Sequence, residues 1–162
     1  MTFRLLVGIA VGTALLAATP QAKKNADSDS DIKEIRDYRL SMDALQKFAN
    51  AYKAMMADSK AQSCFKDSSP GNEKTLDLGE KKLNECPAAV ADIKGAGLKP
   101  REFLVLTTHI LGDMMAVELK RGGQIKTYPA DTISPENAAF LNQNYDKMKA
   151  LLAPMMNGDR DK

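Results

Sequence analysis

Apolar residues recur at alternating spacings of three and four along three long stretches of this sequence, and this spacing is the strongest constraint on the fold. An α-helix has about 3.6 residues per turn, so the spacing gathers the apolar side chains on one face of each helix. The first stretch ends near Asp58, and the second extends from Pro100 to Gly122. The third starts at Ser134 and continues to Pro154. No stretch of useful length alternates apolar and polar residues as a half-buried strand does, so the sequence predicts an all-α protein.

The three apolar stripes indicate which residues form the core. A helix with one apolar face needs neighbours to bury it, and a small antiparallel bundle achieves this most economically. The first stripe is expected to hold Ile35, Tyr38, Met42, Leu45, Ala49, Tyr52 and Met56. The second is expected to hold Phe103, Leu106, Thr107, Ile110, Met114 and Val117, widened by Leu104 and Leu111. The third is expected to hold Ala138, Leu141, Tyr145, Met148, Leu152 and Met155.

The region between the first two stretches is expected to be less regular. Residues 59–72 are rich in serine and contain Pro70 and Gly71, a composition that favours turns. Leucines at positions 76, 78 and 83 indicate a helical turn or two, which the Cys86–Pro87 step interrupts. Pro87 suits the first turn of a short helix through Lys94. We therefore expect a small antiparallel helical bundle of three long helices and one short helix.

The N-terminus has the layout of a bacterial-type secretory signal peptide, in which a basic residue precedes an apolar run. Arg4 precedes the run from Leu5 to Ala18, which at about fourteen residues is shorter than the ~20 that span a bilayer. Cleavage after Ala22 is expected, while a cut near position 17 or 18 and an uncleaved anchor stay open because Pro20 occupies a small-residue position. The protein is therefore expected to be periplasmic or secreted, without a transmembrane anchor after cleavage. The expected divisions are a signal peptide (1–22), a flexible lead-in (23–30), a helical domain (31–156) and a flexible tail (157–162).

Cys64 and Cys86 are the two cysteines of the chain. An even number of cysteines in an exported protein favours a disulfide. The spacing is not that of a redox pair, and no histidine lies near either cysteine to suggest a metal site. A bridge that closes a loop of this size stabilises a small domain by on the order of 3 kcal/mol.

Charge and motifs argue against several classes of function. The chain has 23 basic and 21 acidic residues, and the basic ones do not form the stripe that nucleic-acid binding requires. The sequence has no nucleophile elbow, no phosphate-binding glycine loop and no Glu-x-x-His pair of the di-iron bundles. It also lacks the Cys-x-x-Cys-His motif of covalent haem. We therefore expect neither nucleic-acid binding nor catalysis.

His109 is the only histidine, so any imidazole chemistry must use it. It lies about 100° around the helix from Ile110, the centre of the inward stripe, which places it on the border between core and solvent. Asp113 follows one turn later on the same side, which allows either an ion pair or a shared metal ion. His109, Asp113 and Met114 are the candidate metal ligands.

Methionine is frequent, with nine residues, six of which form three doublets. Adjacent helical residues point about 100° apart, so one member of each doublet can fill the core while the other reaches an edge. Thioethers are ligands for Cu(I), and also serve as adaptable core fillers and contact surfaces. The candidate partner or ligand face comprises Met55, Met56, Met115, Met155 and Met156.

Two functions from different classes follow. The first is an exported, non-enzymatic helical protein without a cofactor, which binds an unidentified protein partner or an apolar ligand and can form a homodimer. The alternative is a periplasmic carrier of copper or of non-covalent haem b, which uses His109 and methionines.

Overall fold

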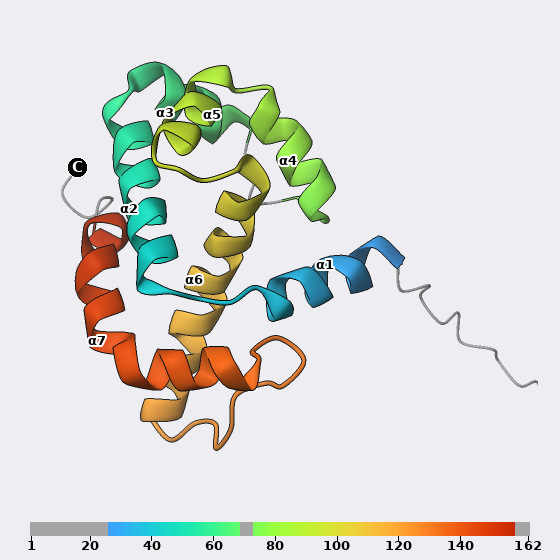
Figure 1. The fold of residues 1–162 in the computed structure, drawn as a ribbon, viewed down its shortest axis with the longest axis vertical. Coiled ribbons are helices and arrows are strands. Elements are labelled where there is room, and N and C mark those ends of the chain that lie inside the picture. Colours follow the sequence, from blue (N-terminus) through green and yellow to red (C-terminus); the bar gives the residue numbers. More distant parts are fainter. Residues whose placement is uncertain (1–25, 69–72, 158–162) are drawn as a thin grey trace, which may run out of the picture.

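The computed structural model describes residues 26–68 and 73–157 (Figure 1). This part of the chain contains seven helices and no strand, so the all-α prediction is confirmed. The predicted signal peptide and its cleavage site lie outside the described residues. The helices are α1 (Ala26–Asp37), α2 (Met42–Ala57), α3 (Ser59–Ser68), α4 (Leu76–Asn84), α5 (Pro87–Gly95), α6 (Pro100–Arg121) and α7 (Pro135–Asn157).

The first predicted helix is two helices, which corrects the continuous stripe expected from Ile35 to Met56. α1 ends at Asp37, and α2 begins after Ser41, whose side chain accepts a hydrogen bond from the Ala44 N–H at 3.1 Å. A serine in this position satisfies an otherwise unpaired amide of the first helical turn. Beyond the break, α2 buries a partly different set of side chains: Ala44, Leu45, Phe48, Ala51 and Met55.

The linker between α1 and α2 is held by Asn137, a buried residue near the start of α7. Its Nδ2 donates to the Tyr38 carbonyl oxygen at 2.8 Å, and its Oδ1 accepts from the Leu40 N–H at 2.9 Å. These contacts satisfy backbone groups that a continuous helix would pair internally. Asn137 is 97 and 99 positions from its two partners, so the local pattern around residue 40 does not reveal the break.

Two other boundaries differ from the predictions. Residues 59–68 form α3 because Asp58 caps it, with Oδ1 accepting from the N–H groups of Lys60 at 2.8 Å and Ala61 at 3.3 Å. Residues 26–30 of the predicted flexible lead-in belong to α1, where the acidic side chain of Asp29 lies near the positive end of the helix dipole. α7 includes Asn157, the first residue of the predicted tail.

The Cys64–Cys86 disulfide is present and joins α3 to the residue that precedes α5. α4 follows Thr75, whose hydroxyl accepts a hydrogen bond from the Leu78 N–H at 3.2 Å. α5 begins at Pro87 as predicted and ends one residue beyond the predicted Lys94. The short helices α3, α4 and α5 therefore form one linked region beside the long helices.

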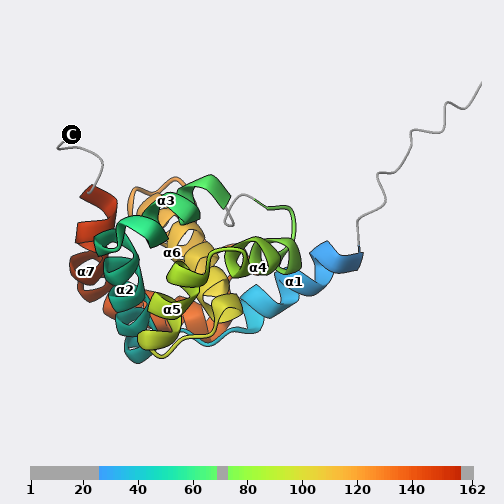
Figure 2. The same cartoon turned by 90° about the horizontal axis from the view of Figure 1, so that it is seen from above.

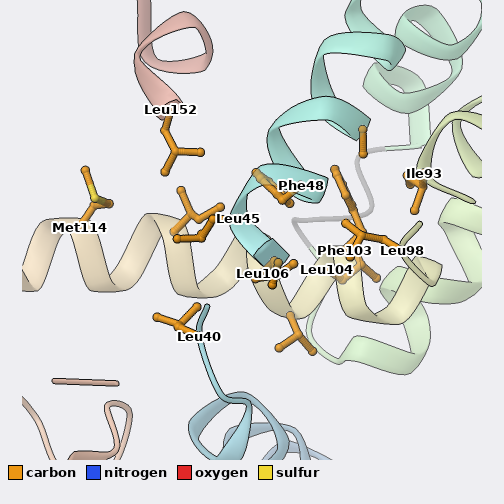
Figure 3. Close-up of a cluster of buried hydrophobic side chains, with 14 of the residues drawn as sticks. Leu40, Leu45, Phe48, Ile93, Leu98, Phe103, Leu104, Leu106, Met114 and Leu152 are labelled. Carbon is orange, nitrogen blue, oxygen red and sulfur yellow. The ribbon is translucent and has the colours of Figure 1, made fainter. Parts of the chain in front are cut away.

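α6 runs through the centre of the molecule, with α2 on one side and α1 and α4 on the other (Figures 1 and 2). The core contains side chains of α2, α5, α6 and α7 (Figure 3). Phe48 of α2 stacks on Phe103 of α6 with 4.8 Å between ring centroids. The predicted bundle of three long helices and one short helix is replaced by seven helices in the described residues, because the first predicted helix is split and α3 and α4 are additional.

Within the described ranges, no helix combines the length and the apolar character needed to cross a lipid bilayer.

Candidate functional site

A groove of about 510 Å³ lies between α1, the start of α4 and the middle of α6. Figures 1 and 2 both show α1 and α4 next to each other on the side of α6 that faces away from α2. The apolar lining of this α1/α4/α6 groove includes Ile32 and Ile35 of α1, Leu76 of α4, and Leu104, Leu111 and Met115 of α6.

One line of residues along α6 forms the floor of the groove. Leu104, Thr108, Leu111 and Met115 follow one another at spacings of three and four, which places them on one face of the helix. Leu104 is buried, whereas Leu111 is 68% exposed and Met115 is 64% exposed. The prediction that Leu111 widens the inward stripe is therefore wrong, because the neighbouring helices cover this line at Leu104 and leave it open at Leu111.

Gly112 leaves a notch in the floor between Leu111 and Met115. A Cβ atom added at Gly112 meets no other atom within 4 Å, and the backbone there does not have the positive φ of Gly97 or Gly123. Glycine inside a helix is less favourable than alanine by about 0.5–1 kcal/mol. Neither backbone conformation nor packing of the described residues therefore requires a glycine at this position.

Exposed apolar side chains are concentrated at this groove. The described residues include four large apolar side chains that are exposed, and three of them line the groove. These are Leu111, Met115 and Ile32, the last 40% exposed; the fourth, Leu78, is on α4. Single exposed apolar residues are normal on protein surfaces, but their grouping in one concave site is typical of a binding surface.

Arg101 ties the α1 wall of the groove to α6 and α4. Its guanidinium donates to both carboxylate oxygens of Glu34 on α1, at 2.7 to 3.0 Å. It also donates to Asp77 and, at 3.4 Å, to Glu80 on α4, and it lies 3.6 Å from Asp31 on α1. The hydrogen bonds to Glu34 and Asp77 raise the pKa of Arg101 above its usual range. Four carboxylates meet one guanidinium, which leaves a surplus of negative charge beside the groove.

His109 holds the C-terminal end of α1. It is 1% exposed, which corrects the predicted position on the border with solvent, because α1 covers it. Its Nε2 lies 2.5 Å from the carbonyl oxygen of Ile35, and its Nδ1 lies 2.8 Å from Oδ2 of Asp113. A carbonyl oxygen only accepts, so Nε2 is the donor to Ile35, and Nδ1 faces the carboxylate of Asp113. The buried His109–Asp113 pair thus satisfies a carbonyl group of the last turn of α1.

Tyr38, the residue that follows α1, adds a further contact with α6. Its hydroxyl donates to Oε1 of Glu102 at 2.9 Å, and its ring centroid lies 5.9 Å from that of His109. Burial, followed by the contact with Glu102, raises the pKa of Tyr38 above its usual range, so the hydroxyl keeps its proton at neutral pH. Polar contacts therefore contribute to the position of the groove wall, together with the packing of Ile35 and Tyr38 against the core.

The candidate metal ligands His109 and Asp113 contact each other directly, and both ring nitrogens of His109 face protein atoms. Met114 belongs to the apolar core together with Leu45 and Leu152 (Figure 3). Across residues 26–68 and 73–157, no group of three or more His, Cys, Asp or Glu side chains is arranged to hold a metal ion. The copper or haem carrier stays a prediction, tested by metal analysis and absorption spectroscopy of wild-type protein and H109A.

The methionine doublets divide between core and edge where both side chains are described. Met55 is fully buried and Met56 is half-buried, and Met114 is buried beside the exposed Met115. Met155 is half-buried, and the side chain of Met156 lies outside the described residues. Of the described side chains in the candidate partner face, Met115 alone lines the groove.

The sequence analysis does not predict the roles of Ile32 and Gly112 in the lining of the groove, or that of Arg101 in joining α1, α4 and α6 beside it. Gly112 had a local signal, since a glycine inside a strongly apolar helix is unfavourable without a packing or functional reason. Arg101 had none, because its partners Glu34 and Asp77 are 67 and 24 positions away.

No protein-family model, curated protein or solved structure matches this chain significantly. The function is therefore inferred from the groove and its surroundings.

Proposed function

We propose that this protein is an exported, non-enzymatic helical protein that binds an apolar group of a partner or ligand in the α1/α4/α6 groove. The observation that carries the proposal is the grouping of Ile32, Leu111 and Met115 in one concave site, although each of them is substantially exposed. Exposing apolar surface to water is unfavourable by roughly 25 cal/mol per Å², and covering it contributes to binding.

The polar residues of the groove support this proposal, because two of them are already satisfied within α6. The hydroxyl of Thr107 donates to the Phe103 carbonyl at 2.8 Å, and that of Thr108 donates to the Leu104 carbonyl at 3.2 Å. Hydroxyls engaged in this way cost less to cover than hydroxyls that depend on water. The size of the groove lies within the roughly 300–1,000 Å³ of typical ligand sites.

The proposed export is supported by the Cys64–Cys86 disulfide, since such bonds persist in oxidising compartments. The signal-peptide pattern of residues 1–22 points the same way from the sequence. The proposal of a non-enzymatic role is supported by His109. Its two ring nitrogens contact the Ile35 carbonyl of α1 and the Asp113 carboxylate, so they are engaged within the protein.

The test uses N-phenyl-1-naphthylamine, an apolar dye whose fluorescence rises on entering an apolar site. G112L fills the notch, and it should fold because a Cβ atom there meets no neighbour and leucine favours a helix more than glycine does. G95L is the matched control, since Gly95 is also an exposed helical glycine with no atom within 4 Å of an added Cβ. We expect G112L to bind the dye about tenfold more weakly, equivalent to about 1.4 kcal/mol, and G95L to bind it like wild type. Equal binding by both variants would contradict the proposal.

A further inference from the structure

We propose that the occupant of the α1/α4/α6 groove is a basic amphipathic helix of a partner protein. Its apolar face would lie along α6, and its cationic flank would face the carboxylates of α1 and α4. This inference rests on the proposed function and adds the shape and the charge of the partner.

The exposure of the groove residues favours a partner larger than a small molecule. Small-molecule sites bury about 70–90% of their ligand and enclose it in apolar walls. Here Leu111 and Met115 stand more than half exposed at the open end of the floor. A small ligand seated against Leu104 would leave both side chains in water, whereas a longer apolar segment laid along the floor would cover them.

The geometry of the floor favours a helix. Leu104 and Met115 are eleven positions apart on α6, which corresponds to about 16 Å or three helical turns. Between them the side chains form one ridge at spacings of three and four, the arrangement into which a second helix packs. The notch at Gly112 allows the backbone of that helix to approach closely, as small residues do where helices cross.

The charge around the groove favours a basic partner. Among the residues of α1 whose side chains are described, four are acidic and two are basic, whereas α4 has two of each. Arg101 balances one of the four carboxylates that it meets, and among these Asp77 has a side chain that is 80% exposed. Of the neighbouring lysines, Lys82 is paired with Glu73 at 2.6 Å, and Lys74 lines the groove itself. The surplus negative charge comes mainly from α1 and disfavours anionic lipid surfaces and nucleic acids.

The experiment measures fluorescence anisotropy with two labelled model peptides of about 18 residues, a length of five helical turns. Both peptides have leucines at helical spacing, and their remaining positions are lysine in one and glutamate in the other. We expect the lysine peptide to bind wild-type protein and G95L about tenfold more tightly than the glutamate peptide, with an advantage that shrinks at high salt. G112L should weaken binding of the lysine peptide about tenfold, because the filled notch keeps the helix away from the floor.

A charge variant tests the acidic wall separately. D77N removes an exposed carboxylate of α4, the helix whose start lines the groove. D146N removes a similarly exposed aspartate of α7 that pairs with Arg121, and neither Asp146 nor Arg121 lines the groove. We expect D77N to weaken binding of the lysine peptide about twofold, the size typical of one exposed charge pair, and D146N to leave it unchanged.

Each other outcome overturns the inference in a different way. Equal binding of both peptides, reduced in both cases by G112L, would contradict the charge preference and leave the proposed function intact. Dye binding that is sensitive to G112L, without binding of either peptide, would assign the groove to a small apolar ligand. Protein binding to phosphatidylcholine–phosphatidylglycerol vesicles that is lost in G112L, without peptide binding, would assign it to a membrane. Loss of the difference between G112L and G95L for the dye would contradict the proposed function itself.

Discussion

His109 on α6 donates a hydrogen bond to the backbone carbonyl of Ile35 on α1, with 2.5 Å between Nε2 and the oxygen, although the two residues are 74 positions apart. This contact and the Arg101–Glu34 pair fix the wall of the groove. Asp31 is the one fully buried side chain among the described residues of α1, and Ile35 packs half-buried against the core. Polar contacts with α6 therefore contribute to the position of α1.

Replacing His109 with alanine should lower the free energy of unfolding by about 3–5 kcal/mol. The variant leaves the buried carboxylate of Asp113 and the Ile35 carbonyl without their shared partner, which is costly in a water-excluded site. Urea unfolding followed by circular dichroism measures the change. D113A in the H109A background should then cost at least about 1 kcal/mol less than D113A alone. Additive effects of the two substitutions would show that the pair is not coupled.

Replacing Arg101 with methionine should loosen α1 and leave α7 unaffected. The variant removes the hydrogen bonds to Glu34 and leaves several carboxylates close together, with an expected local cost of about 2 kcal/mol. Hydrogen exchange detected by mass spectrometry should show faster exchange in residues 29–37. R36M is the control, because Arg36 pairs with its exposed neighbour Asp37. Unchanged exchange in R101M would contradict the proposed role of Arg101 as the anchor of α1.

Stability should fall in alkaline solution partly because of Tyr145. Burial, followed by the hydrogen bond to Glu118, raises the pKa of Tyr145 to about 12 from the usual value near 10. A raised pKa in the folded state means that the stabilisation is complete below about pH 10 and is lost as the pH rises towards about 12. The decrease in urea midpoint between pH 9 and pH 11 should be smaller for Y145F than for wild type. Part of the decrease should persist, because the pKa of Tyr38 is raised too. An identical decrease in both proteins would refute the contribution of Tyr145.

Removing the disulfide should destabilise the region formed by α3, α4 and α5. Cys64 and Cys86 are 22 positions apart, and a bridge across such a loop contributes on the order of 3 kcal/mol. C64A/C86A should therefore unfold at a lower urea concentration than oxidised wild type. Dithiothreitol should lower the stability of wild type and have no effect on the double variant. A reductant effect on C64A/C86A would mean that the loss has another origin.

The features that could be predicted from the sequence are those with local causes. Pro87 and Pro100 mark the starts of α5 and α6, and the two cysteines indicated the disulfide because no other pairing exists. The break between α1 and α2 was missed because Asn137 stabilises it from the other end of the chain. His109 was placed on the border because helical periodicity does not show that α1 covers that face.

The groove could not be predicted because its exposed residues look like ordinary core residues in the sequence. Leu111 fits the apolar stripe of α6, but it is 68% exposed because the neighbouring helices do not cover it as they cover Leu104. The Met114–Met115 doublet predicts that Met115 belongs to a binding face with other methionines. In the structure, Met115 lines the groove with Ile32 and Leu111, and no other described methionine lines it. Gly112 was the one residue of the floor whose identity signalled an unusual environment.

The most direct test of binding in the groove is a ¹³C-methyl NMR titration of the protein with N-phenyl-1-naphthylamine. We predict that the methyl resonances of Ile32, Leu111 and Met115 shift together with one saturation curve, because all three line the groove. The methyl resonances of Met148 and Leu152, which are buried in the core, should stay in place. Saturable shifts elsewhere, without shifts at Ile32, Leu111 and Met115, would contradict the assignment of this groove as the binding site.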